Sequence, residues 1–312
     1  MPRKIIVDCD PGQDDAVAIL LAHGSPEIEL AAITTVAGNQ TLDKTTLNAR
    51  RVATLGGIRG VPIAAGCPAP LLRELVTAGE IHGETGLDGA VWPEPDVPLA
   101  PDHAVDLIVD MVMASPGEIT LVPVGPLTNI ALAVRREPRI AERVREVVLM
   151  GGSVTRGNVT PAAEFNIFVD PEAAAIVFGA GWPLTMIGLD LTHQAEAVPA
   201  VMERFRGLGT APATTVADAL AFYEARYRAE GRNRSVPVHD PCAVARVMSP
   251  ELVRCVDARV EVETRGRWTA GMTVADFKPE RPFNAKVAMK LDVDGFWDLV
   301  IDAMERIGDG GR

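Results

Sequence analysis

The sequence is poor in the residues that mark secreted and membrane proteins. It has only four cysteines in 312 residues, Cys9, Cys67, Cys242 and Cys255, and no CxxC spacing. Reduced thiols in a cytoplasmic protein are therefore expected, rather than a disulfide framework. The apolar run in the N-terminal segment MPRKIIVDCD is too short for a signal peptide. The longest apolar stretch, AVAILLA at 16–22, falls far below the roughly 20 residues of a membrane span, so no membrane partner is predicted.

Basic residues are also scarce. The chain has 30 Lys and Arg against 42 Asp and Glu, a formal net charge of −12. Nucleic acids and anionic membranes bind to basic patches, so neither is an expected partner. With 47% hydrophobic residues, the chain can bury a large core around a site for a small ligand.

Short apolar runs alternate with longer amphipathic segments along most of the chain, as in KIIVDCD before DDAVAILLAHG and EITLVPVG before PLTNIALAVRR. This alternation predicts an α/β fold: a single domain over 1–312 with a mostly parallel central sheet flanked by helices, a Rossmann-like core. The polar segments DCDPGQDD, TVAGN, VPVGPLTN and MGG each follow an apolar run. In open α/β sheets ligands bind at such carboxyl ends of strands, so these segments are expected to form one pocket.

Two longer segments interrupt the pattern. Residues 67–101 are rich in Gly and Pro around HGETGLDG, and residues 195–235 contain helical patterns including ALAFYEARYRAEGR. Long insertions in compact domains are usually functional, and both are predicted to form lids or walls over the site. The stretch GFWDLVIDAMERI predicts a last helix that ends at Gly308.

Four carboxylates, Asp8, Asp10, Asp14 and Asp15, occupy the eight positions 8–15. Like charges at this spacing repel one another unless a cation or hydrogen-bond donors compensate. A helix cap would account for one or two of them. A hard divalent cation accounts for the set: calcium fits the oxygen ligands, magnesium remains an alternative, and zinc would need His or Cys.

A DxD after the first strand also occurs in aspartyl-phosphate phosphatases of the haloacid-dehalogenase type. Those enzymes have a small hydroxyl residue soon after the second Asp and a late pair of acids. This chain instead has Pro11-Gly12 and a second pair of aspartates at 14 and 15. The phosphatase is therefore the weaker hypothesis, and a non-catalytic nucleoside or ribose binder is another.

Two later segments carry polar groups suited to a sugar. MGGSVTRGNVTPAAEFNIFVDPEAA (150–174) is a glycine-rich loop with Asn158, Glu164 and Asn166 before a helix expected near Pro171. Amide and carboxylate groups can bond several hydroxyls at once. VHDPCAVA (238–245) sets His239 beside Asp240 at a predicted helix start.

Together these segments resemble the nucleoside hydrolase family, of the inosine-uridine preferring type. The motifs occur in the family's order: DCDPGQDDAVAI, TTVAGN, HGETGLDG, VPVGPLTNIA, MGG, GNVTPAAEFNIFVDPEAA, GLDLTH and HDPCAVA. The resemblance implies calcium-dependent hydrolysis of the N-glycosidic bond of purine and pyrimidine ribonucleosides, with pyrimidine-specific hydrolysis as the alternative. It also implies a homo-oligomer, a homotetramer or a homodimer.

By the same resemblance, each site residue has an expected role. Calcium is held by Asp10, Asp15, Asp240 and the main-chain carbonyl of Val124. Asp14 and Asn166 match positions for the 2′- and 3′-hydroxyls, Asn158 and Glu164 match positions for the 5′-hydroxyl, and Asn39 lies near the ribose. Asp8 is expected to orient the ligands.

The chemistry of these residues predicts the catalytic roles. Asp10 is the expected general base, and His239 is the expected acid because histidine titrates near neutrality. By the family resemblance, His82 matches a position near the base and could assist His239. It lies in a loop whose Gly83, Gly86 and Gly89 suggest that the loop can move over the substrate. Tyr223 and Tyr227 are the only tyrosines and share one helical face. They are expected to contact the nucleobase.

Overall fold

The computed structural model describes residues 2–231 and 235–308, which share one nine-stranded sheet in the order β3-β2-β1-β4-β5-β6-β9-β7-β8. Pairing is parallel from β3 to β9 and antiparallel between β9, β7 and β8. The strands are β1 (Arg3–Cys9), β2 (Ile28–Thr35), β3 (Ile63–Ala65), β4 (Ile119–Pro123), β5 (Glu146–Met150), β6 (Leu184–Ile187), β7 (Val253–Val262), β8 (Thr273–Asp276) and β9 (Ala285–Leu291).

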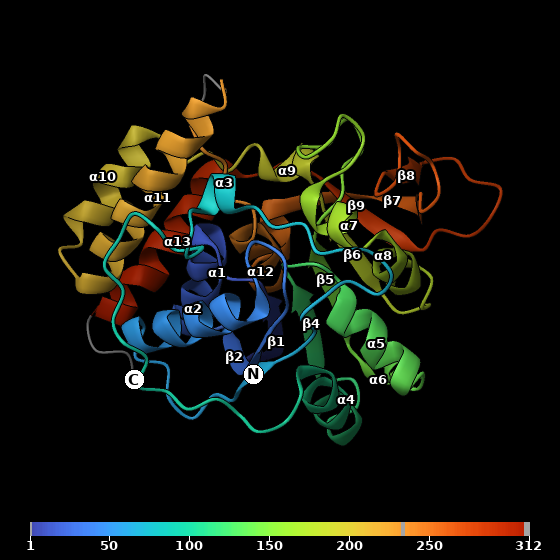
Figure 1. Ribbon diagram of the computed structural model, residues 1–312, viewed down its shortest axis with the longest axis horizontal. Helices are drawn as coiled ribbons and strands as arrows, with labels where there is room; N and C mark the ends of the chain where they lie inside the picture. Colours follow the sequence, from blue (N-terminus) through green and yellow to red (C-terminus); the bar gives the residue numbers. More distant parts are fainter. Residues whose placement is uncertain (1, 232–234, 309–312) are drawn as a thin grey trace.

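Helices cover both faces of the sheet (Figure 1). They are α1 (Gln13–Gly24), α2 (Leu42–Leu55), α3 (Gly79–His82), α4 (Ala104–Ala114), α5 (Thr128–Arg136), α6 (Ile140–Arg143), α7 (Phe165–Val169), α8 (Pro171–Phe178), α9 (Leu189–Thr192), α10 (Pro199–Gly207), α11 (Ala211–Ala229), α12 (Pro241–Met248) and α13 (Val293–Gly308). A 3-10 turn, Pro250–Leu252, precedes β7. The predicted α/β class with a mostly parallel, helix-flanked sheet is confirmed.

Strand β1 shows how the sequence builds this layered core. Its side chains alternate between faces, as a pleated strand requires. Ile5 and Val7 join a buried cluster with α1, α2 and α11 to α13, whereas Ile6 joins a second cluster with α4, α5 and α8. A strand buried on both faces reads as a continuous apolar run, which is why KIIV precedes the first aspartate.

The carboxyl ends of the central strands meet at one edge of the sheet. The parallel register sets Asp8 beside Thr34 of β2 and Pro123 of β4, so the segments that follow β1, β2 and β4 leave the sheet together. Helix α1 starts at Gln13, which confirms that Asp14 and Asp15 lie in its first turn. Helix α8 begins at Pro171 and α13 ends at Gly308, as predicted.

The segment around Glu164 differs from the prediction. The loop expected up to Pro171 contains a short helix, α7, with Glu164 at its N-cap, so Asn166 lies on a helix rather than in a loop. A capping carboxylate bonds the free N–H groups of the first turn, and this shows why Glu164 stands before FNIFV. A five-residue helix is too short to show a helical period of apolar residues, so the sequence pattern did not predict it.

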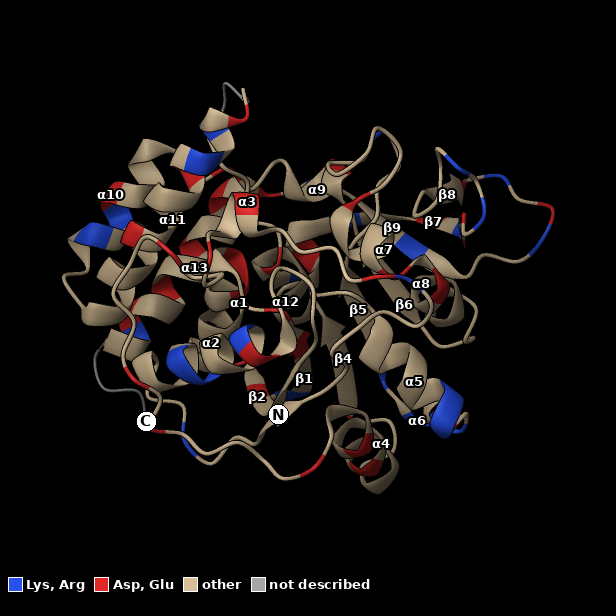
Figure 2. Ribbon diagram, viewed as in Figure 1, with Lys and Arg blue, Asp and Glu red and all other residues tan. Residues whose placement is uncertain are grey.

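The distribution of basic residues and the hydropathy of the helices agree with the composition. In Figure 2, Lys and Arg are scattered over several elements and form no continuous stripe in this view. None of the helices within 2–231 and 235–308 combines the length and apolar character needed to cross a membrane.

Candidate active site

The turn between β1 and α1 holds the first carboxylates in place. Asp15 Oδ1 accepts a hydrogen bond from the backbone N–H of Asp10 (3.1 Å), and its Oδ2 accepts one from Gly12 (2.9 Å). Asp10 Oδ2 in turn accepts from the backbone N–H of Asn39 (2.6 Å), in the loop that follows β2. Backbone donors therefore fix both side chains below the floor of the site.

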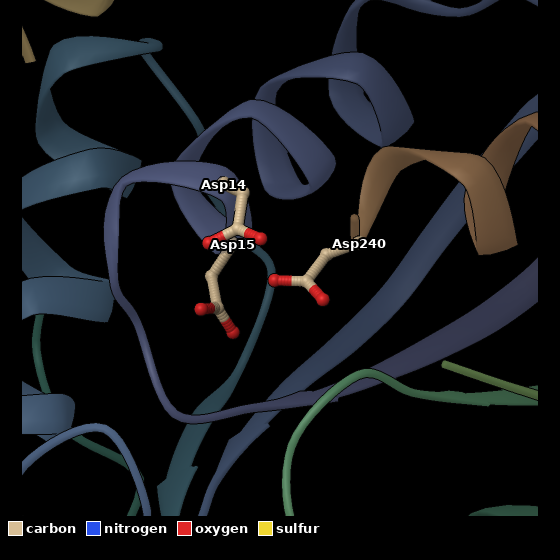
Figure 3. Close-up of side chains that lie close together, drawn as sticks. All are labelled: Asp14, Asp15 and Asp240. Atoms are coloured by element: carbon tan, nitrogen blue, oxygen red, sulfur yellow. The ribbon is translucent and has the colours of Figure 1, made fainter. Parts of the chain in front are cut away.

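Asp240 joins this group from the far end of the chain. It stands at the N-cap position of α12, and its carboxylate lies near those of Asp14 and Asp15, with one oxygen of each within 4.8 Å of the others. Figure 3 shows the three carboxyl groups close together, two from α1 and one from α12. Asp10, predicted as a metal ligand, lies outside this set of three, and Asp14, predicted to hold ribose, lies inside it.

The electrostatics of the cluster are unfavourable without a cation. Burial and the neighbouring Asp15 raise the pKa of Asp14 to about 7, and burial raises that of Asp15 to about 6. Burial and the neighbouring aspartates raise the pKa of Asp240 well above its ordinary value. No ion pair within the described ranges reaches these carboxylates. Buried anions are retained where they are paired or coordinate a metal. The all-oxygen donor set fits a hard divalent cation such as Ca²⁺ or Mg²⁺ and does not fit zinc.

Asp8 lies behind the cluster in a separate network. It is fully buried, and its Oδ1 accepts from Thr34 Oγ1 (2.6 Å) and Asn129 Nδ2 (2.7 Å). Its Oδ2 is buried without a partner among the described residues. Burial raises the pKa of Asp8 to about 7. Sequence reasoning missed Asn129, although its place in VPVGPLTN, directly after a strand end, was a usable signal.

The opposite wall of the site is built by α7 and the end of β5. Glu164 Oε1 accepts from the N–H of Asn166 (3.0 Å), and its Oε2 accepts from Gly152 (2.9 Å) and Ile167 (3.2 Å). Asn166 Nδ2 donates to the carbonyls of Val124 (2.8 Å) and Met150 (3.1 Å). These bonds bring Glu164 and Asn166 of the α7 segment together with Val124, which follows β4.

A cavity of about 400 Å³ opens above these groups. Eleven of the thirteen predicted site residues line it: Asp14, Asn39, His82, Val124, Asn158, Glu164, Asn166, Tyr223, Tyr227, His239 and Asp240. Asp10 and Asp15, with 1% and 0% exposure, lie beneath it. Lining residues that the sequence did not predict are Val76, Thr77, Ala78, Glu80, Ile81, Met150, Val159, Phe165 and Glu230. Glu80 and Glu230 carry a charge, and Met150, Val159 and Phe165 fall within the segment 150–174, whereas the remaining four have no charge or motif that distinguishes them in sequence.

His239 is held at the cavity by contacts on two sides. Its Nδ1 lies 2.7 Å from Thr192 Oγ1, and its backbone N–H donates to Asp14 Oδ2 (3.3 Å). The ring of His193 meets it edge-on at 5.7 Å. Thr192 and His193 come from GLDLTH, so this motif supports the histidine rather than the ligand directly.

His82 has a different environment. It is buried, its Nδ1 lies 2.6 Å from Gln13 Oε1, and its ring centroid is 5.1 Å from that of Tyr223. Burial lowers the pKa of His82 to about 4, so the neutral imidazole is the stable form at neutral pH. This does not favour His82 as a proton donor.

The glycines after His82 are required by conformation and packing. Gly83 and Gly89 adopt φ values of +86° and +101°, which residues with a side chain rarely adopt. A Cβ atom would lie 2.3 Å from Asp88 Oδ2 at Gly83 and 2.1 Å from Phe222 Cβ at Gly89. The glycines therefore allow the loop to pack closely on its neighbours, and this gives a reason for their presence other than the mobility expected from sequence.

Comparisons with known proteins agree with this geometry. Residues 5–298 match the family model described as "Inosine-uridine preferring nucleoside hydrolase". The chain belongs to this family. It is therefore an N-glycosyl hydrolase that acts on ribonucleosides, and neither the phosphatase nor the non-catalytic binder is supported.

Curated relatives extend over the whole chain. Inosine-uridine preferring nucleoside hydrolases of Leishmania major and Crithidia fasciculata are 58% and 56% identical, each over 99% of both chains. A pyrimidine-specific ribonucleoside hydrolase RihA of Enterobacter sp. is 47% identical over 97% of this chain and 98% of its own. Among solved structures, a purine-preferring ribonucleoside hydrolase from Gardnerella vaginalis superposes with a TM-score of 0.93 at 33% identity, over 99% of this chain and 100% of its own.

Proposed function

We propose that this nucleoside hydrolase is calcium-dependent and cleaves both purine and pyrimidine ribonucleosides to ribose and free base. The observation that carries the proposal is the group of buried aspartates without a basic partner in the described chain, at the floor of a cavity lined by amides, glutamates and two tyrosines. Such a floor suits a hard cation, and such walls suit a sugar and a flat base.

The metal would be held by Asp10, Asp15, Asp240 and the Val124 carbonyl. The close approach of Asp15 and Asp240 supports its position, and the Val124 oxygen, which accepts from Asn166, has a second lone pair for a cation. When bound, calcium supplies positive charge that orients hydroxyl groups and makes water more acidic. Asp8, behind this floor, would keep the supporting network in place.

The walls would hold the ribose. Asp14 and Asn166, which both line the cavity, would bond the 2′- and 3′-hydroxyls. Asn158 and Glu164 would bond the 5′-hydroxyl from the α7 side, where the N–H of Phe165 already donates to Asn158 Oδ1 (3.0 Å). Asn39, which donates from Nδ2 to Asp15 Oδ2 (3.2 Å), would lie beneath the ring near the attacking water.

Cleavage of the ribosyl C–N bond builds positive charge on the sugar and negative charge on the base. Asp10 would take the proton of the attacking water, and the surrounding carboxylates would stabilise the cationic sugar. His239 would give a proton to the departing base, since the contact with Thr192 orients its ring at the cavity wall. His82 would lie near the base without serving as the main proton donor.

Base specificity would be set by the two tyrosines of α11. Tyr223 and Tyr227 lie on the same face of α11 and line the cavity, where their rings can stack on a base of either size. The relatives at 56–58% identity are inosine-uridine preferring, which supports broad specificity. The 47% identical relatives are pyrimidine-specific, so uridine and cytidine specificity is the alternative.

The two long inserted segments would enclose the site. Segments 67–101 and 195–235 would act as its walls, since residues 76–78, residues 80–82 and the two tyrosines line the cavity. Positions 232–234 of the second segment lie outside the described residues. A homodimer or homotetramer and a cytoplasmic location are proposed from the family resemblance and the free cysteines. Native mass spectrometry of the purified protein would test the oligomeric state.

Ribose release tests the function directly. Purified protein should release ribose from inosine, adenosine, guanosine, uridine and cytidine, and a chelator should abolish the release until calcium is restored. Restoration by magnesium alone would contradict the choice of calcium. Release from uridine and cytidine only would establish the pyrimidine-specific alternative.

A further inference from the structure

His82 presents one ring nitrogen to the protein interior. It ends α3 at the cavity wall, with 6% of the residue exposed, and its ring is tilted 32° to that of Tyr223. Only Nδ1 has a hydrogen-bonding partner in the described chain, the side chain of Gln13. Nε2 lies on the other side of the imidazole, so the chemistry offered to a ligand depends on which nitrogen carries the proton.

The amide of Gln13 decides that question. Its Nε2 donates to two backbone carbonyls, those of His82 and Asp88, both at 3.1 Å. Its Oε1 lies 2.6 Å from His82 Nδ1. Exchanging the amide oxygen and nitrogen would set an oxygen against two carbonyl oxygens, none of which can donate. Oε1 must therefore be the acceptor, and Nδ1 of His82 must carry the proton.

The loop fixes this arrangement from several sides. Gln13 is 1% exposed in the first turn of α1, and the same loop is also bonded by Gln40 Nε2 to the carbonyl of Gly83 (2.9 Å) and by Asn48 Nδ2 to that of Thr85 (2.8 Å). The imidazole thus has little freedom to turn its other nitrogen toward Gln13. In the neutral ring, which burial favours, Nε2 bears a lone pair.

We propose that Gln13 is a positioning residue that keeps His82 in the Nδ1–H form, so that Nε2 accepts a hydrogen bond from an N–H or O–H group of the nucleoside. This inference rests on the proposed function, in which the cavity takes a nucleoside. Since Asp14 and Asn166 are assigned to the 2′- and 3′-hydroxyls, and the 5′-hydroxyl to the α7 side, the expected donor is the ring N–H of the base. The 5′-hydroxyl is the alternative, and would require its single proton to point to His82 rather than to Glu164. His82 would then recognise substrate, and protonation of the leaving base would be left to His239.

The tautomer can be measured without substrate. Two-bond ¹⁵N–¹H correlation spectra of calcium-loaded protein should show His82 as the Nδ1–H form, and the Gln13→Leu variant should lose this preference. Gln40→Leu is the matched control, because it removes a bond to the same loop without touching the imidazole, and it should keep the Nδ1–H form. An Nε2–H ring in the wild-type protein would overturn the inference.

Kinetics identify the donor. Gln13→Leu should lower kcat/KM for uridine by about two- to tenfold, the range of one hydrogen bond. A smaller loss with 3-methyluridine, which lacks the ring N–H, would identify the base as donor, and a smaller loss with 5′-deoxyuridine would identify the hydroxyl. Equal losses on all three substrates, or an equal loss in Gln40→Leu, would overturn the recognition role. If wild-type protein hydrolysed no nucleoside, the proposed function would fail while the tautomer would still stand or fall by the spectra.

Discussion

The backbone N–H of His239 donates a hydrogen bond to Asp14 Oδ2 over 3.3 Å, although the two residues are 225 positions apart. This contact joins the start of α12 to the start of α1, two helices that also pack against one another beside β1. It places the proposed acid, the proposed ribose ligand and Asp240 at one point. The chemistry of the site thus depends on the docking of two helix N-termini.

Metal-free protein should lose stability as the pH rises from about 5 to 7. Asp8, Asp14, Asp15 and Glu164 have pKa values raised to about 6 or 7, so the folded state keeps protons that unfolded Asp or Glu has lost, and deprotonation disfavours folding. The lowered pKa of His82, about 4, acts in the opposite direction below pH 6.5, but it is one group against four. Urea unfolding in chelator across this range would measure the trend.

The same titration should make metal binding stronger at higher pH. Each proton released on binding changes the apparent affinity by about tenfold per pH unit. The calcium-induced rise in Tm should therefore grow from pH 5 to pH 8. A rise in Tm that is constant over this range would show that the cation binds elsewhere.

Asp240→Asn should separate charge repulsion from metal binding. In chelator at pH 8 the variant should be more stable than the wild type by at least about 1 kcal/mol, because one buried like charge is removed. With calcium it should lose roughly 100-fold or more of its activity. Asp298→Asn, on the exposed side of α13, is the control and should change neither quantity. A less stable metal-free variant would contradict the repulsion argument.

Substitutions at His239 should act on the leaving group. His239→Ala should lower kcat for inosine by about 10²- to 10⁴-fold, the usual contribution of a general acid. Thr192→Val should lower it about tenfold with little change in KM, since the ring loses the hydroxyl beside its Nδ1, and Thr192→Ser should retain activity. With p-nitrophenyl riboside, whose leaving group needs no proton, both deficits should largely disappear. A persistent deficit would assign the histidine another role.

Asn129→Ala should destabilise the protein by about 3 kcal/mol. The side chain is fully buried, donates to Asp8 Oδ1 and the Thr35 carbonyl, and accepts from the N–H of Cys67 (2.9 Å). Its removal leaves several buried polar groups unpaired, each at a cost of about 1–3 kcal/mol. Urea unfolding of the calcium-loaded protein gives the value, and a change below about 1 kcal/mol would show that water replaces the amide.

Gly89→Ala should be more damaging than Gly57→Ala. Both residues have positive φ, but an added Cβ would overlap Phe222 at Gly89 and would meet nothing within 4 Å at Gly57. Backbone strain alone costs about 1–2 kcal/mol, and the overlap adds to it at Gly89. Thermal unfolding of the two variants separates strain from packing. Equal losses would indicate that the loop can move away from α11, as a lid would.

Much of this site was predictable from sequence because its signals are local. The apolar run before Asp8 determines a strand buried on both faces, PGQDD determines where a helix begins, and a parallel sheet brings the carboxyl ends of its strands to one edge. These properties follow from side-chain alternation, turn chemistry and strand geometry over a few residues, and they were sufficient to indicate an acidic ligand site in an α/β domain.

Tertiary structure decided what local signals do not contain. Side-chain packing grouped the carboxylate of Asp14, and not that of Asp10, with those of Asp15 and Asp240. It also made Glu164 the cap of a five-residue helix and placed the Gln13 amide beside the His82 ring. Each outcome depends on the position and direction of hydrogen-bonding atoms from elements distant in sequence. Residue spacing states which groups are available, whereas packing of α1, α7 and α12 determines which atoms face one another.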